Sequence, residues 1–190
     1  VPQCSNRTKG WGGMAGDVKR LLEYVAQQET ADTTRIYIFG GSMGGTGTWK
    51  MLSLYPSYFA AAMPCAGNPK GMNAENIATT PVYTVMGLAD KIMGSDVRTT
   101  VETLVGQLEV MGDDVRYETV AGWTHEMTCI QSYSAERLDW VFSHKRGQTT
   151  DLIISPIDST DETWYDLSGR RFTMPPSRGV YIHRGKKVVF

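Results

Sequence analysis

The sequence has 190 residues, 41% of them hydrophobic, which suits one globular domain of ordinary size with a small appendage. Its 19 Lys and Arg residues nearly balance its 20 Asp and Glu residues, giving a formal net charge of −1. This balance argues against a nucleic-acid-binding protein, which usually carries a basic excess, and against a disordered acidic chain. No apolar stretch reaches the roughly 20 residues that a membrane-spanning helix needs.

Residues 1–147 alternate between helix-like and strand-like patterns. In chain order we expect a helix at about 16–28, a strand at 35–39, a helix from about 44 to Pro56, strands at 59–64 and 81–86, a helix at 96–111, a strand at 114–120 and a helix at 135–144. The apolar residues of the first helix recur at helical spacing and should share one face: Val18, Leu21, Leu22 and Val25. Strands separated by helices predict βαβ units and a parallel sheet, and therefore an α/β fold.

The last forty residues show a different sequence pattern, with short, turn-rich, β-prone segments. Lys145–Thr150 is polar and contains a glycine, as linkers often do. Val180–Ile182 and Lys187–Phe190 predict two strands of a hairpin around Arg184–Lys186. We therefore expect an α/β domain at 1–147 and a linker with a small β-rich module at 148–190.

A glycine-rich corner follows the strand at 35–39. Gly40–Gly44 matches the pattern G-x-S-x-G between a strand and a helix, the setting in which a serine hydroxyl is lifted above a sheet as a nucleophile. Ser42 would be that nucleophile, and the backbone N–H of Met43 would stabilise the oxyanion. The alternative is a loop that only turns the chain. A phosphate-binding loop is disfavoured because no Gly-Lys-Ser/Thr ending follows and Lys50 lies too far along the helix.

A nucleophilic serine needs a base, and three histidines are available. His125 follows the strand at 114–120, in a loop at the carboxyl end of the sheet, where parallel sheets build their sites. His144 ends a helix and His183 belongs to the tail, so His125 is the expected base. The alternative for His125 is a surface histidine paired with Glu126.

The acid that orients the histidine should lie between serine and histidine in chain order. Asp90 follows the strand at 81–86 and is the expected acid. Asp96 is its rival, but it opens a long helix and is interpreted more simply as an N-cap. Asp113 and Asp114 precede the last strand, at the wrong end of the sheet.

Three segments together resemble α/β-hydrolase-fold esterases: Ile36–Trp49, Met86–Asp90 and Gly122–His125. The nearest groups are the polyhydroxybutyrate-depolymerase-like and feruloyl-esterase-like enzymes and related predicted prolyl-oligopeptidase-type hydrolases. The resemblance covers about residues 12–145. In the segment that carries Asp90, a methionine stands where the family usually has histidine, which would alter the cleft beside the acid.

The resemblance implies a fold of eight strands in the order 1-2-4-3-5-6-7-8, of which this chain would hold the C-terminal half, parallel strands 5–8 with flanking helices, plus a small β tail. The first four strands, and the loop that supplies a second oxyanion donor, would be missing. Gly10–Gly13 lies in the wrong place to replace that loop. The implied activity is serine carboxylester hydrolysis through an acyl-enzyme, without cofactor or metal, on feruloyl, acetyl or similar esters of plant polysaccharide. An oligopeptidase-type serine peptidase and a non-catalytic remnant or binding module remain alternatives.

The tail resembles the C-terminal sorting tails of secreted Bacteroidetes proteins through residues 163–171 and 178–189. That resemblance implies contact between residues 151–190 and a secretion machinery, and a secreted or cell-surface location. The alternative is an accessory β-module that only packs or binds carbohydrate.

Three weaker signals concern aromatic, sulfur and metal-binding side chains. Trp123, beside the expected base, is a candidate substrate-binding residue. Cys65 and Cys129 would be able to pair if the protein is exported, but buried free thiols are an equal alternative. No His, Cys or Asp cluster has the spacing of metal ligands.

Overall fold

The computed structural model describes residues 4, 10–28, 30–147, 163–166, 171–174, 179–183 and 186–189. The chain divides into two compact units, Val1–Gln148 and Thr149–Phe190, and each is described by itself. No helix among the described residues is long and apolar enough to cross a membrane.

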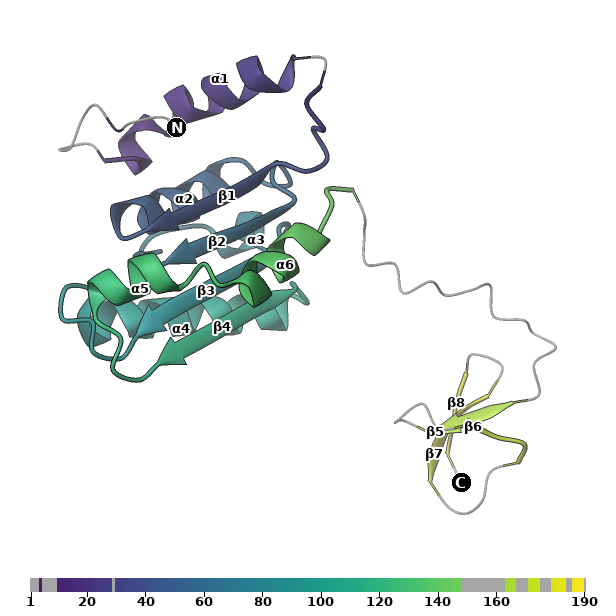
Figure 1. Ribbon diagram of the computed structural model, residues 1–190. Coiled ribbons are helices and arrows are strands. Elements are labelled where there is room, and N and C mark those ends of the chain that lie inside the picture. The colour runs from purple at the N-terminus through teal and green to yellow at the C-terminus, as the bar shows by residue number, and fades with distance from the viewer. Residues whose placement is uncertain are drawn as a thin grey trace. The chain divides into compact units, whose positions relative to one another are not determined.

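The first unit is built on a four-stranded parallel sheet in the order β1-β2-β3-β4 (Figure 1). Its strands are β1 (Tyr37–Gly41), β2 (Ala61–Cys65), β3 (Val82–Gly87) and β4 (Val115–Val120). Every residue of β2 and β3 is buried, as expected for strands that are covered on both faces. The sequential order confirms the expected run of four neighbouring parallel strands.

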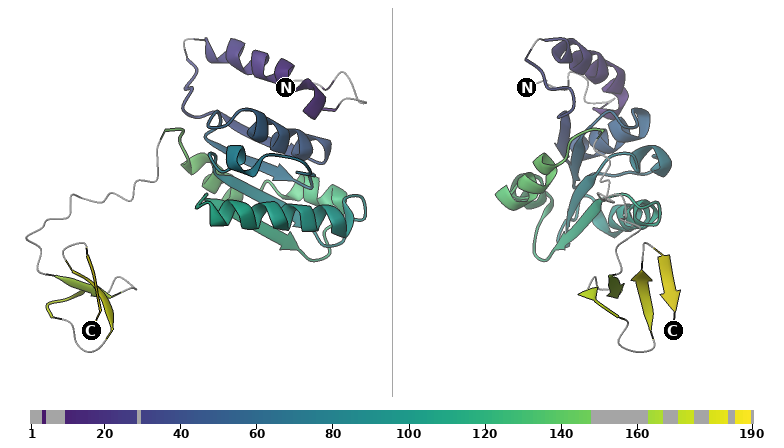
Figure 2. Two further views of the ribbon diagram at one scale, coloured as in Figure 1. Left: turned by 180° about the vertical axis from the view of Figure 1, so that it is seen from behind. Right: turned by 90° about the vertical axis from the view of Figure 1, so that its right-hand side faces the viewer.

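Helices cover both faces of this sheet (Figure 2). On one side lie α2 (Met43–Leu54), α3 (Ala74–Ile77) and α4 (Gly94–Val110); on the other lie α5 (His125–Gln131) and α6 (Ala135–Ser143). A short 3₁₀ turn, η1 (Gly12–Met14), leads into α1 (Ala15–Ala26). The short helices α3 and α5 were not predicted, because one or two turns are too few to show helical periodicity.

Each face of the sheet carries its own apolar core. Trp49 and Leu52 of α2 pack with Phe59 on the first face, and all three side chains are almost completely buried. On the second face, Met63 and Val141 join a cluster beneath α5 and α6. The two cores fix the strands and helices on either side of the carboxyl ends of the sheet, where the expected site residues lie.

β1 is one of the two edge strands of the parallel sheet. β1 ends the strand order, so its outer edge pairs with no strand among the described residues. Only half of the predicted stripe of α1 is correct: Val18 and Leu22 pack on the core, whereas Leu21 and Val25 are exposed. A cavity of about 350 Å³ borders this edge, lined by Trp11, Val18, Ile38, Phe39, Gly40, Gly44, Gly47, Thr48 and Met51.

The second unit is a small antiparallel sheet in the order β6-β5-β7-β8. Its strands are β5 (Trp164–Asp166), β6 (Arg171–Phe172), β7 (Val180–His183) and β8 (Lys186–Val189). β7 and β8 form the predicted hairpin. The Trp164 ring stacks on His183, with the ring centroids 4.0 Å apart. Residues 148–150 of the predicted linker, and residues 184 and 185 of the predicted turn, lie outside the described residues.

Candidate active site

Ser42 occupies a strained corner between β1 and α2. Its φ of 57° and ψ of −119° are unusual for a residue with a side chain and are typical of a nucleophile corner. Its backbone N–H donates to the carbonyl of Cys65, 3.1 Å away on the neighbouring strand end. The corner closes only because its neighbours are small: a Cβ on Gly40 would lie 2.2 Å from the carbonyl oxygen of Gly44.

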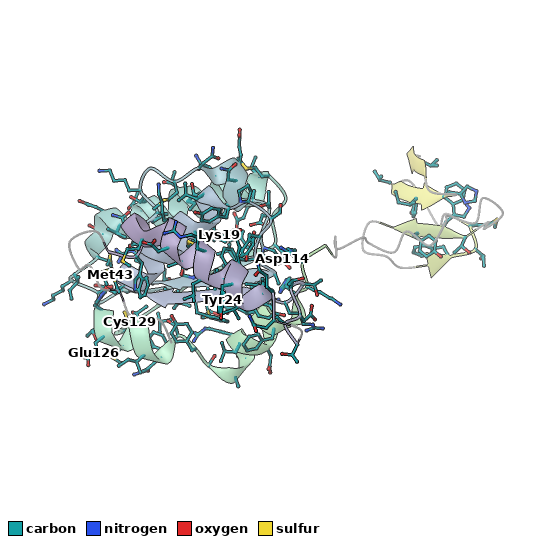
Figure 3. All side chains as sticks on the ribbon, turned by 90° about the horizontal axis from the view of Figure 1, so that it is seen from above. Lys19, Tyr24, Met43, Asp114, Glu126 and Cys129 are labelled. Atoms are coloured by element: carbon teal, nitrogen blue, oxygen red, sulfur yellow. The ribbon has the colours of Figure 1, made fainter. Side chains whose placement is uncertain are left out.

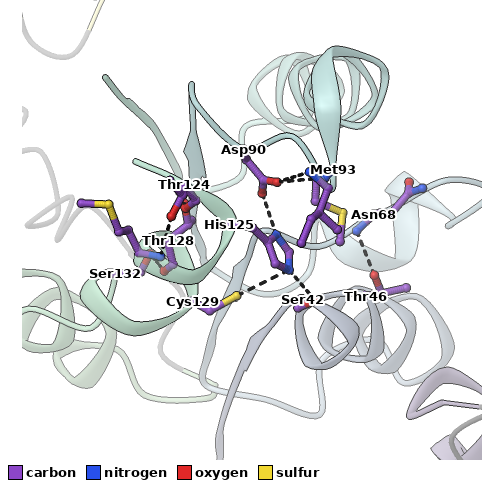
Figure 4. Close-up of polar contacts among 12 residues, drawn as sticks. Ser42, Thr46, Asn68, Asp90, Met93, Thr124, His125, Thr128, Cys129 and Ser132 are labelled. Atoms are coloured by element: carbon purple, nitrogen blue, oxygen red, sulfur yellow. Dashed lines mark hydrogen bonds and ion pairs between the residues drawn. The ribbon is translucent and has the colours of Figure 1, made fainter. Parts of the chain in front are cut away.

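His125 connects Ser42 to Asp90 (Figure 4). Its Nε2 lies 2.7 Å from Ser42 Oγ, and its Nδ1 lies 2.7 Å from Asp90 Oδ2. The Asp90 carboxylate can only accept, so Nδ1 carries the proton and Nε2 is free to accept the proton of the Ser42 hydroxyl. The structure therefore brings the three residues expected from the sequence into one hydrogen-bonded chain.

Two further hydrogen bonds hold the Asp90 carboxylate in place. Its Oδ1 accepts from the backbone N–H groups of Ile92 and Met93, both at 2.9 Å. The residue is only 5% exposed, so these bonds replace the water that a surface carboxylate would bind. One oxygen of Asp90 is thus held by the backbone, and the other is aimed at His125.

The expectation that His125 lies in a loop is wrong, because it is the first residue of α5. Thr124 is the N-cap of this helix, and its side chain accepts from the backbone N–H of Met127 at 3.3 Å. A threonine before a short amphipathic run is the sequence signal that could have revealed the helix. A Cβ on Gly87 would lie 2.4 Å from Thr128 Oγ1, so the glycine is what lets α5 approach the end of β3.

The other candidate acids are Asp96, Asp113 and Asp114. α4 begins at Gly94 with Met93 as its N-cap, so Asp96 lies inside the first turn and the N-cap interpretation is wrong. Burial raises the pKa of Asp113 to about 7. Asp114 lies at the end of the unit opposite Met43 and Cys129 (Figure 3).

The other two histidines have partners away from Ser42. His144 Nε2 is 3.0 Å from Asp114 Oδ2, at the amino end of the sheet. His183 lies in the second unit, where its Nδ1 is 3.4 Å from the carbonyl of Thr163. His125 is therefore the histidine that the structure places against the strained serine.

Apolar side chains lie on several segments around the triad. Trp123 is half-buried and packs against the cluster beneath α6, with the Arg137 guanidinium 5.5 Å from its ring, and its contact with substrate stays a prediction. The exposed apolar residues at this end are Met43, Leu88 and Ile92, which adjoin Ser42 and Asp90 in the sequence.

The methionine that replaces the family's histidine does not border the cleft. Met86 is 1% exposed and packs with Val101 and Val105 of α4. The expected change to the cleft beside the acid is therefore wrong: this side chain lies on the face of β3 that α4 covers.

The described cysteines, Cys4, Cys65 and Cys129, are free thiols in the structure. Cys129 Sγ lies 3.9 Å from His125 Nε2. Among the described residues, no group of three His, Cys, Asp or Glu could hold a metal ion.

Comparisons with known proteins bear on the fold that carries these residues. The model of the Prolyl oligopeptidase family matches residues 8–91, a range that includes Ser42 and Asp90. The crystal structure of a thermostable esterase superposes with a TM-score of 0.62 and 29% identity, over 68% of this chain and 36% of that one. This chain has a partial α/β-hydrolase fold. The same fold is seen in Porphyromonas gingivalis dipeptidyl peptidase 4, with a TM-score of 0.56 and 17% identity, over 68% of this chain and 22% of that one.

Curated relatives match a shorter segment of this chain than the esterase structure does. Acetylxylan esterase A of Emericella nidulans is 34% identical over 71 residues, which are 37% of this chain and 23% of the relative. Acetylxylan esterase A of Aspergillus oryzae is 31% identical over 71 residues, again 37% of this chain and 23% of the relative. The chain thus spans less than a quarter of the length of these relatives.

Proposed function

We propose that the chain carries the Ser42–His125–Asp90 triad of a serine carboxylester hydrolase. The observation that carries the proposal is the pair of 2.7 Å contacts that join a strained serine, a histidine and a buried carboxylate. Esterases among the relatives and the structural neighbours support the ester-hydrolase class.

The geometry suits acyl transfer. As the Ser42 oxygen attacks the ester carbonyl, its proton passes to His125 Nε2. The negative oxygen of the tetrahedral intermediate would be stabilised by the backbone N–H of Met43, which lies at the N-terminus of α2. His125 then gives the proton to the leaving alcohol. Water hydrolyses the acyl-enzyme by the same steps, with Asp90 stabilising the imidazolium throughout.

Within this class, an acetyl ester of a plant polysaccharide is the proposed substrate, with feruloyl and similar short or aromatic esters next. The relatives named acetylxylan esterase support the acetyl group. A near-neutral net charge of −1 suits an uncharged polymer. The match to the Prolyl oligopeptidase family supports a second candidate, a serine peptidase, since one triad serves both reactions.

A panel of four substrates separates these candidates in the complete polypeptide: an acetylated xylan oligosaccharide, methyl ferulate, p-nitrophenyl acetate and a proline-containing peptide. We expect the highest kcat/KM on the acetylated oligosaccharide and none on the peptide. Cleavage of the peptide alone would replace the esterase proposal with the peptidase. No turnover of any substrate would favour the non-catalytic remnant.

Activity is proposed to need segments upstream of this chain. Among the described residues one oxyanion donor is proposed, the N–H of Met43, and no strand pairs with the outer edge of β1, where a cavity of about 350 Å³ lies. Residues 1–190 alone are therefore expected to self-associate and to be nearly inactive. Replacing exposed Leu21 and Tyr24 of α1 with lysine should shift the chain toward monomer in size-exclusion chromatography. The same change at Val110, which is 90% exposed on α4, should not. A monomeric and active wild-type chain would contradict this prediction.

The second unit is proposed to direct secretion to the cell exterior or surface. Two observations support this role. The tail resembles the C-terminal sorting tails of secreted Bacteroidetes proteins, and it forms a compact antiparallel sheet. Deleting residues 151–190 should leave kcat/KM unchanged within about twofold, but should stop export from the native host, as measured by fractionation and immunoblotting. Normal export of the truncated protein would overturn this role.

A further inference from the structure

Cys129 fills a space that a glycine leaves open beside the triad. Its Sγ and Cβ both lie 3.2 Å from the point that a Cβ on Gly41 would occupy. The same sulfur lies 3.9 Å from His125 Nε2, the nitrogen that faces Ser42 (Figure 4). Any bond formed at this sulfur would therefore change the surroundings of the Ser42–His125 contact.

A second thiol lies in the same layer. Cys65 is the register partner of Gly41 across the β1–β2 ladder, and register partners point to the same face of a sheet. Its side chain is fully buried and interacts with the side chain of Ser132, the C-cap of α5, three residues after Cys129. Both thiols thus occupy the interface between the sheet and α5.

We propose that Cys65 and Cys129 are an oxidisable dithiol whose disulfide draws α5, and with it His125, away from Ser42. The effect on activity rests on the proposed function, whereas the cross-link does not. Neighbouring strands are roughly 5 Å apart, and the Cα of Cys129 lies 3.3 Å from the Cβ point on Gly41. With Cys129 above Gly41 and Cys65 one strand away, these spacings put the two Cα atoms roughly 7 Å apart, at the upper end of the range that a disulfide spans. Closing the bond would draw Cys129 from β1 toward β2, and so draw α5 away from the β1 end that carries Ser42.

The reaction balances with a small disulfide as the oxidant. The Cys129 thiol gives its proton to a base, for which His125 Nε2 is the adjacent group, and the thiolate attacks one sulfur of the reagent, releasing one small thiol. The Cys65 thiolate then attacks Cys129 Sγ and releases the second small thiol. Two protein thiols are oxidised, and the reagent disulfide is reduced to two thiols.

Both thiols are shielded, which makes the exchange slow. Burial raises the pKa of Cys65 to about 11. Burial and the nearby Asp90 charge also raise the pKa of Cys129. Because the thiolate is the attacking species, the rate should increase as the pH rises above neutrality. The pair would respond to sustained oxidation rather than to brief exposure.

The test oxidises the complete polypeptide with glutathione disulfide and maps its peptides without reduction. We expect a Cys65–Cys129 linked peptide, a fall in free thiols by two, and a loss of at least tenfold in ester turnover that dithiothreitol reverses. The downfield proton resonance of the His125–Asp90 hydrogen bond should shift on oxidation, a readout that needs no turnover. Cys4→Ser should keep the whole response, whereas Cys65→Ala and Cys129→Ala should each abolish the linked peptide.

Mixed disulfides with glutathione but no linked peptide would overturn the proposal, and so would a linked peptide with an unchanged His125 resonance. Because mapping needs only the wild-type chain, unstable variants leave the result intact. If the reduced protein hydrolyses no ester, the proposed function fails separately, while the peptide map and the resonance still decide the dithiol.

Discussion

Replacing Ser42 with alanine in the complete polypeptide is expected to lower kcat for an ester substrate by roughly 10⁴- to 10⁶-fold. Alanine removes the attacking oxygen, and His125 Nε2 then has no hydroxyl to deprotonate. KM should change little, because the other substrate contacts remain. Steady-state kinetics on the best substrate of the panel measures the loss, and thermal unfolding shows whether the fold is kept.

Ser57 offers a matched control. It shares the positive φ of 57° that Ser42 has, and in both cases alanine keeps the Cβ of serine and removes only the hydroxyl. The backbone N–H of Ser57 donates to Thr79 Oγ1, and alanine preserves this hydrogen bond. Ser57→Ala should therefore keep turnover within about twofold. Substantial activity in Ser42→Ala, at a melting temperature like that of wild type, would remove Ser42 from the nucleophile role.

Much of this arrangement could be predicted because it is local or periodic. A strand, a glycine-rich corner and a helix follow one another around Ser42, and the turn needs small residues wherever it occurs. The alternation of strands and longer helices likewise predicted the parallel sheet, and the resemblance to the α/β-hydrolase fold implied its sequential order.

What could not be predicted depends on contacts between distant segments. Trp123 packs against the core beneath α6 and beside the Arg137 guanidinium, contacts that its own neighbours in sequence do not reveal. Leu21 and Val25 follow helical spacing but stay exposed, since no described segment covers that side of α1. α5 is too short to show periodicity, so the placement of His125 on a helix depended on recognising its cap.

The strand ends are tied together where the site forms. Beyond the Ser42–Cys65 contact, the backbone N–H of Ala66 donates to Val85 at 3.1 Å, and that of Leu88 donates to Val120 at 2.9 Å. These bonds continue the ladder of the sheet into the loops that carry the site residues. The three side chains are thus held by backbone structure before any substrate arrives, which is the preorganisation that acyl transfer requires.

Replacing Asp90 with asparagine is expected to lower kcat by about 10⁴-fold while leaving the fold intact. The amide oxygen can still accept from Ile92 and Met93, so the amide nitrogen takes the place of Oδ2 and faces His125 Nδ1. That nitrogen donates, so it favours the tautomer whose proton is on Nε2. An imidazole in this tautomer cannot accept the proton of the Ser42 hydroxyl.

Asp96→Asn is the matched control for the acid, because Asp96 was the rival and lies six residues away on α4. Its described side-chain contact is a 3.4 Å one with Ser95, so turnover should stay within about twofold of wild type. Kinetics and the downfield proton resonance of the His125–Asp90 bond should be measured in parallel, since Asp90→Asn should abolish the resonance and Asp96→Asn should keep it. If the large loss of turnover follows Asp96 instead, Asp90 is not the acid that orients His125.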